Sequence, residues 1–173
     1  MVVHNAQIAN IFEQKADLLD IQGANQYRIR AYRTAARTIN RLSKPLQEVI
    51  KEGKDLTELD GIGKDLAKKI NEIVETGKLE QLEKLKSEMP PGLLEMLKIE
   101  GLGPKRVKKL YQELNIKSID DLRSAVKNKS VQKLEGFGEK TAENILSGIK
   151  KLKDSGNRIL LMQAEKLIEP LVN

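Results

Sequence analysis

Cysteine and tryptophan are absent from this chain of 173 residues, and histidine occurs only once. Without cysteine the chain can form neither a disulfide nor a thiolate metal site, which fits an intracellular protein, and we expect a cytoplasmic location. The single histidine, His4, excludes a histidine metal cluster and a serine–histidine hydrolase. No apolar run approaches the ~20 residues that span a bilayer, so we expect no membrane partner.

Aromatic residues make up only 3% of the chain, so the core must come mainly from leucine, isoleucine, valine and alanine. Apolar residues recur at helical spacing, and the alternation typical of strands is missing. We therefore expect an all-α fold made of helical bundle units. A formal charge of +6 and an isoelectric point near 9.4 favour an acidic partner. No Gly-x-x-x-x-Gly-Lys-[Ser/Thr] loop is present, which argues against a nucleotide hydrolase.

The main positive feature is a short glycine signature that recurs three times, at Leu59–Gly63, Ile99–Gly103 and Leu134–Gly138. Each copy has an aliphatic residue, an acidic residue, a glycine, an apolar residue and a second glycine, and an amphipathic stretch follows it. We interpret each copy as a helix-hairpin-helix motif. The alternative is that the glycines simply end helices. A bare helix cap, however, needs neither the second glycine nor the repeated pattern.

A glycine hairpin at the start of a helix is suited to holding a phosphate. The first glycine adopts backbone angles closed to other residues, and the second lets the backbone approach a ligand closely. The helix start adds unpaired N–H groups and the positive end of the helix dipole. Acidic residues accompany the third hairpin, so we expect it to be the weakest phosphate site, a structural brace or a protein contact. The predicted phosphate-binding residues are Gly61, Gly63, Lys64 and Lys68, then Gly101, Gly103, Lys105, Arg106 and Lys109, then Gly136, Gly138 and Lys140.

A second basic feature is the segment 21–47, which contains no acidic residue. Its cations recur at helical spacing and predict one stripe along a helix, which would suit a phosphate strand. The alternative is an ordinary solvated face, although such faces usually mix charges of both signs. Tyr27 and Tyr32 lie beside the stripe and could stack on a base or bind a phosphate. The stripe comprises Arg30, Arg33, Arg37, Arg41 and Lys44.

The best candidate for a domain boundary is the run Pro90-Pro91-Gly92. We expect one domain over residues 1–89, which contains the first hairpin, and a second over residues 90–173, which contains the other two. Near the end of the chain, Ser155-Gly156 is expected to break the helix that follows the third hairpin. A last helix would then carry the apolar residues Ile159, Leu160, Leu167 and Ile168.

One lysine is a candidate for covalent chemistry. Lys69 lies at the edge of the apolar face of the helix after the first hairpin, whereas Lys68 points nearly opposite that face. Burial and neighbouring cations both disfavour a charged amine, and a neutral amine can attack an aldehyde to form a Schiff base. The alternative is a lysine that buries only its stem and keeps its ammonium group in water.

Together these motifs resemble the N-terminal part of family X DNA polymerases, the polymerase beta relatives. The resemblance implies a lyase-like, 5′-phosphate-binding domain over residues 1–89 and a DNA-gripping helical domain over residues 90–173. The third hairpin resembles an additional hairpin of the bacterial and archaeal branch. The stretches that carry the resemblance are Arg30–Ala36, Leu59–Gly63, Thr76–Leu79, Pro90–Leu122 and Leu134–Thr141.

The resemblance also implies roles for individual residues. It places the family's Schiff-base lysine at Lys69 and two residues of its 5′-phosphate pocket at Arg28 and Tyr32. The chain departs from the vertebrate enzyme at Tyr27, where that enzyme has a histidine, and at Asp65 and Gln81, where it has lysines. Hairpins of this family often hold a monovalent cation on backbone carbonyls. Here Na⁺ or K⁺ would lie on the carbonyls of Thr57, Leu59 and Ile62 and on those of Leu97, Ile99 and Leu102.

The polymerase palm, a sheet with an Asp-x-Asp pair and a third carboxylate for two metal ions, has no counterpart in this sequence. The chain therefore requires no cofactor, and Mg²⁺ only if a palm follows. We expect a monomeric piece of a longer repair polymerase, with a free-standing DNA-binding protein as the alternative. Three functions are open: binding of gapped or nicked DNA with a 5′ phosphate, removal of 5′-deoxyribose phosphate through Lys69, or a helical protein-interaction scaffold.

Overall fold

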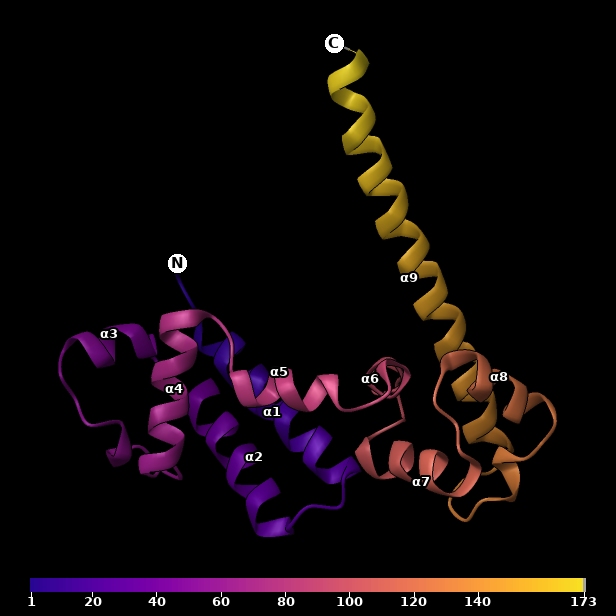
Figure 1. Cartoon of the computed structure of the whole chain (residues 1–173), viewed down its shortest axis with the longest axis horizontal. Helices are drawn as coiled ribbons and strands as arrows, with labels where there is room; N and C mark the ends of the chain where they lie inside the picture. The colour runs from indigo at the N-terminus through magenta and orange to yellow at the C-terminus, as the bar shows by residue number, and fades with distance from the viewer. Residues whose placement is uncertain (173) are drawn as a thin grey trace. The chain divides into compact units, whose positions relative to one another are not determined.

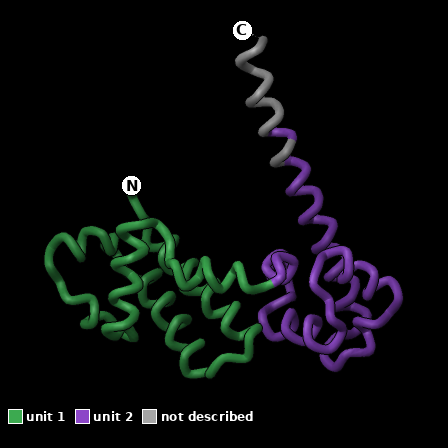
Figure 2. The backbone as a smooth tube through the Cα atoms, viewed as in Figure 1, with its two compact units in different colours: residues 1–89 green, residues 90–173 purple. Residues whose placement is uncertain are grey.

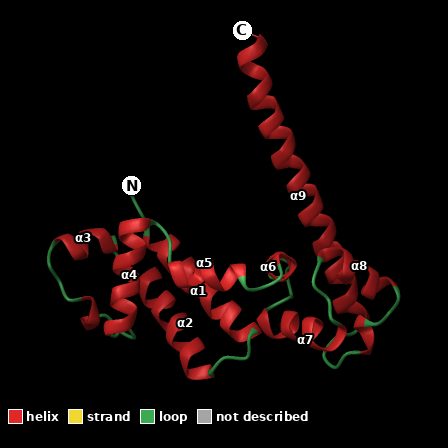
Figure 3. Cartoon of the chain, viewed as in Figure 1, coloured by secondary structure: helices red, strands yellow, loops and turns green. Residues whose placement is uncertain are grey.

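The computed structural model places the backbone of residues 1–172 and describes the side chains of residues 1–158, Leu161 and Met162. Every regular element in this part of the chain is a helix (Figures 1 and 3). The expectation of an all-α fold with helix-hairpin-helix motifs is thus confirmed. The chain divides into two compact units, Met1–Met89 (unit 1) and Pro90–Asn173 (unit 2), which Figure 2 shows in two colours.

Unit 1 is organised around the pair α1 and α2, and α4 and α5 both pack against α1. Gly23 takes a φ of 76° in the short connection between α1 and α2, which lets the chain reverse direction there. Asn25 then caps α2, because its side chain accepts a hydrogen bond from the Tyr27 N–H at 2.8 Å. The elements are α1 (Asn5–Ile21), α2 (Gln26–Asn40), α3 (Leu46–Lys51), the 3₁₀ turn η1 (Leu56–Glu58), α4 (Lys64–Thr76) and α5 (Glu80–Ser87).

An aromatic contact lies at the centre of the α1–α2 interface. The rings of Phe12 and Tyr32 meet edge to face, with their centroids 5.6 Å apart and their planes at 77°. Tyr32 is only 3% exposed, whereas Tyr27 is 79% exposed. The expectation that the Tyr32 ring can stack on a base is therefore wrong, because the ring is part of the core of unit 1. Tyr27 keeps its ring available.

The basic stripe of α2 is also interrupted. Arg33 Nη1 lies 2.8 Å from Glu13 Oε2 and 3.0 Å from Asp17 Oδ1, so this arginine ties α2 to α1. Burial raises the pKa of Asp17, and the hydrogen bond from Arg33 opposes that rise. The expectation that the stripe lacks acidic partners is wrong for Arg33. Its partners lie on a different helix, where sequence spacing along α2 could not find them.

Lys44, a second residue of the stripe, is ion-paired as well, whereas the other three residues of the stripe are exposed. Lys44 lies just beyond α2 and pairs with Glu52 at 2.9 Å, in a fully solvated setting. Arg30, Arg37 and Arg41 are exposed on the side of α2 that faces away from the core. Within the described part of the chain, these three arginines form no ion pair.

Unit 2 consists of α6 (Pro91–Met96), α7 (Pro104–Leu114), α8 (Ile119–Lys127), the 3₁₀ turn η2 (Val131–Lys133) and α9 (Glu139–Val172). Two glycines permit close packing inside it. A Cβ on Gly148 of α9 would lie 2.5 Å from Ile99 Cγ2, and one on Gly92 of α6 would collide with the backbone carbonyl of Lys117. Gly92 therefore serves helix packing in addition to following the two prolines that begin unit 2.

The expected break at Ser155-Gly156 is wrong, because α9 continues through both residues to Val172. A glycine inside a helix costs only about 1 kcal/mol relative to alanine, which is too little by itself to end a helix of this length. The side chains of Ile159, Leu160, Leu167 and Ile168, predicted for a separate last helix, lie outside the described residues. Over the described part of the chain, no helix combines the length and the apolar character needed to cross a membrane.

The Arg33 ion pairs lead to a stability prediction. Replacing Arg33 with alanine should destabilise the α1–α2 pair by about 1–2 kcal/mol, because Asp17 would be left half-buried without its partner. Replacing exposed Arg30 with alanine should change stability by less than about 0.5 kcal/mol. Native-state hydrogen exchange of the α1 and α2 amides measures both effects in the whole chain. Equal losses in the two variants would contradict this role of Arg33.

Candidate nucleic-acid interface

The three glycine signatures form three turns with the same hydrogen bonds, here called hairpin 1 (59–63), hairpin 2 (99–103) and hairpin 3 (134–138). In each turn the N–H of the fourth residue donates to the carbonyl of the first, at 3.0–3.1 Å. The third residue is the first glycine, and its φ is 75° at Gly61, 89° at Gly101 and 86° at Gly136. This is the pattern of a type II turn, which requires a positive φ at that position.

The two glycines of each hairpin are exposed, and the apolar residue between them is buried. Ile62, Leu102 and Phe137 are each only 2–4% exposed, so each one anchors its turn to its own unit. The glycine backbone on either side is therefore held rigidly at the surface. This arrangement is what a backbone phosphate-binding corner needs, because the corner must be both fixed and accessible.

Neither backbone angles nor neighbouring atoms require the second glycine of each hairpin to be a glycine. Gly63 has a φ of −92° and Gly103 a φ of −80°, which any residue can adopt. No atom lies within 4 Å of a Cβ built on Gly63, Gly103 or Gly138. Each of these glycines also accepts the first hydrogen bond of the helix that follows, so it occupies the N-cap position. The space that a side chain would fill is left open toward the solvent.

The helix starts at these corners are not closed by side chains. No side chain caps the N-terminus of α4 at Gly63 or that of α7 at Gly103 among the described residues. The first N–H groups of an α-helix have no partner within the helix, and together with the dipole they attract anions. Pro104 opens α7, where a missing N–H costs nothing. The corners thus present donors and free space at the same place.

Hairpin 1 is braced by α2. Thr38 Oγ1 donates to the Asp60 carbonyl at 2.8 Å, and a Cβ on Gly61 would lie 2.8 Å from Thr34 Cγ2. The exposed Arg37 donates from Nη2 to Thr34 Oγ1 at 3.2 Å. Because Thr34 contacts Gly61, the Arg37 guanidinium lies close to hairpin 1. The structure therefore joins two sets of predicted phosphate ligands, the hairpin and one arginine of the stripe.

In unit 2, two predicted phosphate ligands are turned toward protein carbonyls. Arg106 Nη1 donates to the Gly101 carbonyl at 2.8 Å, and its guanidinium lies over the Phe137 ring at 5.7 Å. Lys109 Nζ donates to the Glu135 carbonyl at 2.7 Å. Both side chains come from α7, so they link hairpin 2 to hairpin 3. In this conformation the Arg106 and Lys109 side chains hold the turns of hairpins 2 and 3 together.

The remaining lysines that we predict to bind phosphate are accessible to solvent. Lys64 and Lys68 of hairpin 1, Lys105 of hairpin 2 and Lys140 of hairpin 3 are all exposed. None of them takes part in an ion pair within the described residues. Near hairpin 3, Glu139 lies 3.7 Å from Lys129, which places a carboxylate at the helix start. The expectation that hairpin 3 is the least favourable of the three for a phosphate stays a prediction.

The carbonyls suggested as cation ligands surround hairpins 1 and 2. The Leu59 carbonyl accepts from the Ile62 N–H at 3.1 Å, and the Ile99 carbonyl accepts from the Leu102 N–H at 3.0 Å. A carbonyl oxygen has two lone pairs, so each could still hold a cation. The assignment of Na⁺ or K⁺ to the carbonyls of Thr57, Leu59 and Ile62, and of Leu97, Ile99 and Leu102, stays a prediction.

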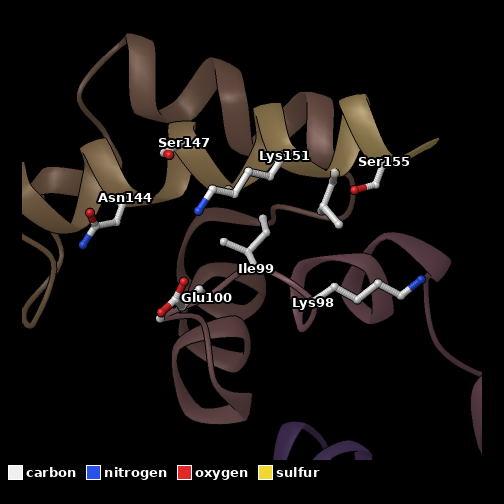
Figure 4. A pocket seen from close by; sticks show the side chains of 10 residues that line it. Lys98, Ile99, Glu100, Asn144, Ser147, Lys151 and Ser155 are labelled. Carbon is white, nitrogen blue, oxygen red and sulfur yellow. The ribbon is translucent and has the colours of Figure 1, made fainter. Parts of the chain in front are cut away.

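Beside hairpin 2 lies a hollow of about 570 Å³ between residues 98–101 and the first part of α9 (Figure 4). Gly101 itself lines it, together with polar side chains of α9 that include Asn144 and Ser147. Lys151 points from α9 toward the Ile99–Glu100 turn (Figure 4). The corner at Gly101 is therefore open on its α9 side, and a lysine lies close to it.

Lys69, the candidate for covalent chemistry, is buried in unit 1. It is 7% exposed, and its Nζ lies 2.5 Å from Asp65 Oδ2, one turn earlier on α4. The hydrogen bond from Lys69 lowers the pKa of the Asp65 carboxyl. The stem of Lys69 is therefore buried, while its Nζ pairs with a carboxylate that is itself 81% exposed. Lys68, its neighbour, is exposed as expected.

A second buried lysine, Lys15 of α1, was missed by the sequence reasoning. It is 2% exposed, its Nζ donates to Gln81 Oε1 of α5, and it lies 5.1 Å from the centroid of the Tyr32 ring. Burial, followed by the charges of Lys69 and Arg28, lowers its pKa from 10.5 to about 8. A signal was present in the sequence, since Lys15 lies between Phe12 and Leu19 on the apolar face of α1.

Lys15 and Arg28 line a small cavity of about 250 Å³ in unit 1 with residues of α5, among them Gln81 and Lys84. Arg28 was predicted as part of a 5′-phosphate pocket, and the structure places it near this buried amine. Lys69 does not line the cavity itself, but its charge acts on Lys15. Unit 1 therefore contains a basic pocket that is separate from the corner of hairpin 1.

The lowered pKa of Lys15 predicts a pH dependence of stability. Below pH 8 both the folded and the unfolded chain hold this proton, and the folded state bears the full cost of a buried charge. Between about pH 8 and 10.5 only the unfolded state keeps the proton, so stability should rise with pH. Relative to Lys15→Met, the wild type should gain roughly 1–3 kcal/mol across that window. Urea unfolding followed by circular dichroism measures the difference, and Lys68→Met, which keeps Lys15, should gain stability with pH as the wild type does.

Comparison with known proteins supports this description of both units. A family model described as a helix-hairpin-helix domain matches residues 3–79, and one described as a SAM-like helix-hairpin-helix tandem matches residues 93–151. The chain is 35% identical over 147 residues to the DNA polymerase/3′-5′ exonuclease PolX of Bacillus subtilis, which is 85% of this chain and 25% of that protein.

Two further relatives share shorter parts. DNA polymerase lambda of Arabidopsis thaliana is 29% identical over 114 residues, 54% of this chain and 22% of that protein. A DNA ligase of Natranaerobius thermophilus is 49% identical over 55 residues, 32% of this chain and 8% of that protein. The chain thus spans a quarter or less of the length of each relative. Both of its units are helix-hairpin-helix domains. The chain belongs to the family X DNA polymerases and corresponds to the helical region of these proteins.

Proposed function

We propose that this chain binds the sugar-phosphate backbone of DNA through its hairpins, without reading the base sequence. The observation that carries the proposal is the second glycine of hairpins 1 and 2. Gly63 and Gly103 occupy N-cap positions where φ is negative and no neighbouring atom excludes a side chain. A backbone ligand that must come within hydrogen-bond distance of the helix start explains why the position is a glycine.

The charges support an anionic strand as that ligand. Lys64 and Lys105 stand next to the two corners and are exposed. Arg37 reaches the neighbourhood of hairpin 1 from α2, so phosphates on either side of the corner would find a cation. Such contacts neutralise phosphates of any sequence, and they should give steep salt dependence with little base specificity.

The form of DNA that we propose is a gapped or nicked duplex with a 5′ phosphate. Unit 1 offers a basic pocket at Arg28 in addition to hairpin 1, and unit 2 offers two further hairpins. The similarity to PolX supports a role beside a polymerase palm in base-excision repair. In that setting the palm would use Mg²⁺, whereas the hairpins would use at most Na⁺ or K⁺. We propose that the chain acts as a monomer in the cytoplasm.

The proposal predicts that Gly103→Val weakens DNA binding about tenfold or more. A side chain at this position would keep the phosphate from the N–H groups of α7, and hydrogen bonds to charged groups are worth about 1.5–3 kcal/mol each. The loss should be the same for unrelated sequences. Fluorescence anisotropy with a gapped duplex, with and without a 5′ phosphate and at several salt concentrations, measures it.

The first control is to show that Gly103→Val still folds. Gly103 has open space and an ordinary φ, so Gly103→Val should change stability by no more than about 1 kcal/mol. Gln112→Val, on an exposed position later in α7, should bind like the wild type. An unchanged affinity of folded Gly103→Val, or a salt-independent affinity of the wild type, would overturn the proposal in favour of a protein-interaction scaffold.

A second function, removal of 5′-deoxyribose phosphate, is favoured by the buried amines of unit 1. Lys69 and Lys15 are both nearly inaccessible to solvent, and the charge of Lys69 is one of the causes that lower the pKa of Lys15. Desolvation next to a second cation is the usual way in which a lysine becomes a nucleophile toward an aldehyde. Following the family resemblance, we propose Lys69 as a residue that forms the Schiff base.

Borohydride trapping on gapped DNA with a 5′-deoxyribose phosphate tests this second function. The full chain should give a covalent adduct, and Lys69→Ala should lower its yield severalfold because one of the reactive amines is gone. Lys68→Ala, which removes the exposed neighbouring lysine, should trap like the wild type. An undiminished adduct in Lys69→Ala would remove Lys69 from this role.

A further inference from the structure

Lys15 is the buried lysine that lines the cavity of unit 1, and its Nζ donates to Gln81, which lines the same cavity. The cavity, of about 250 Å³, is lined by Lys15 and Leu19 of α1, Arg28 of α2 and residues of α5. Lys69 is not among its lining residues, and its Nζ is ion-paired with Asp65 at 2.5 Å. A small ligand in this cavity would therefore meet Lys15.

The lining of this cavity suits a ligand with an anionic group and an uncharged reactive group. Arg28 and Lys84 supply two cations beside Lys15, and Gln81 supplies a neutral amide that already binds Lys15 Nζ. Glu88 is the one carboxylate in the lining. Arginine and lysine are the common partners of phosphate, and an amine is the partner of an aldehyde. A sugar phosphate with a free aldehyde combines both groups.

We propose that Lys15 is a second imine-forming residue of unit 1, and that it reacts with an aldehyde-bearing sugar phosphate held in the cavity by Arg28 and Lys84. The proposal rests on the lyase function proposed above and adds a residue that the family resemblance does not mark. Lys15 would act in parallel with Lys69, from a different helix.

The charges around Lys15 favour its neutral form. Burial has the largest effect, and the cations Lys69 and Arg28 act in the same direction, while Asp65 and Glu72 oppose them. The resulting pKa of about 8 leaves about a tenth of the amine neutral at pH 7. An ordinary lysine with a pKa of 10.5 is neutral in only about three molecules in ten thousand at that pH.

The covalent step balances without any further reactant. The neutral amine of Lys15 adds to the C1′ aldehyde carbon of the opened sugar, and the carbinolamine loses water to give a protonated imine. Loss of a C2′ proton to solvent water then drives cleavage of the C3′–O bond, and the DNA strand leaves as a phosphate. Hydrolysis of the remaining imine frees the lysine. Borohydride instead delivers hydride to the imine carbon and leaves a stable secondary amine.

The first experiment uses pyridoxal 5′-phosphate, a small aldehyde with a phosphate, on the full wild-type chain. After borohydride reduction, peptide mapping at pH 7 should show labelling of Lys15 at least tenfold faster than that of exposed Lys68. The labelling rate of Lys15 should level off above about pH 8, whereas that of Lys68 should continue to rise. Labelling of Lys15 no faster than that of Lys68 would overturn the proposal, and this measurement needs no variant to fold.

The second experiment maps the adduct on gapped DNA with a 5′-deoxyribose phosphate. We expect wild-type adduct at both Lys15 and Lys69. Lys69→Ala should keep a measurable adduct at Lys15, and Lys15→Met combined with Lys69→Ala should lose it. Adduct at Lys69 alone, with no pyridoxal label on Lys15, overturns the inference and leaves the lyase function standing. Absence of any DNA adduct from a chain that binds the duplex overturns the lyase function, and with it the sugar-phosphate substrate inferred here.

Discussion

The structure depends on a backbone constraint that recurs in three places. In each hairpin a glycine with positive φ closes a turn. The next residue is buried and anchors the turn to the core of its own unit. After hairpins 1 and 2 the next helix then begins at the surface with no side chain capping its first N–H groups. Gly61, Gly101 and Gly136 are required by the turn itself. Gly63 and Gly103, in contrast, are required neither by their backbone angles nor by crowding, and among the residues favoured at an N-cap, glycine leaves the helix start most open to a ligand.

The arginine and lysine side chains of this chain have two different roles, and their contacts distinguish the two. Arg33 binds Glu13 and Asp17, while Arg106 and Lys109 bind carbonyls of the hairpins. These side chains hold helices and turns in place. Arg30, Arg37 and Arg41, and the lysines at the corners, remain exposed on the surface. A high density of basic residues therefore overstates the number that can meet a phosphate directly.

The pair of buried lysines in unit 1 adds a chemical possibility to a binding scaffold. Lys69 has Asp65 as an ion-pair partner, whereas Lys15 has a neutral amide and an aromatic ring around its amine. Burying an amine without a carboxylate costs stability, and such costs are often found at functional sites. In unit 1 that amine belongs to Lys15, a residue that lines the cavity.

The helical class, the three hairpins and the glycines that form them could be predicted from the amino-acid sequence, because these features depend on residues close together in the chain. The position of Lys69 at the edge of an apolar face could be predicted in the same way. The burial of Tyr32 in the core, the ion pairs of Arg33 and the burial of Lys15 beside Gln81 became visible only in the folded chain. Those outcomes depend on which helices pack together. Spacing along one helix shows which side a residue occupies, but the partner on that side comes from a distant part of the chain.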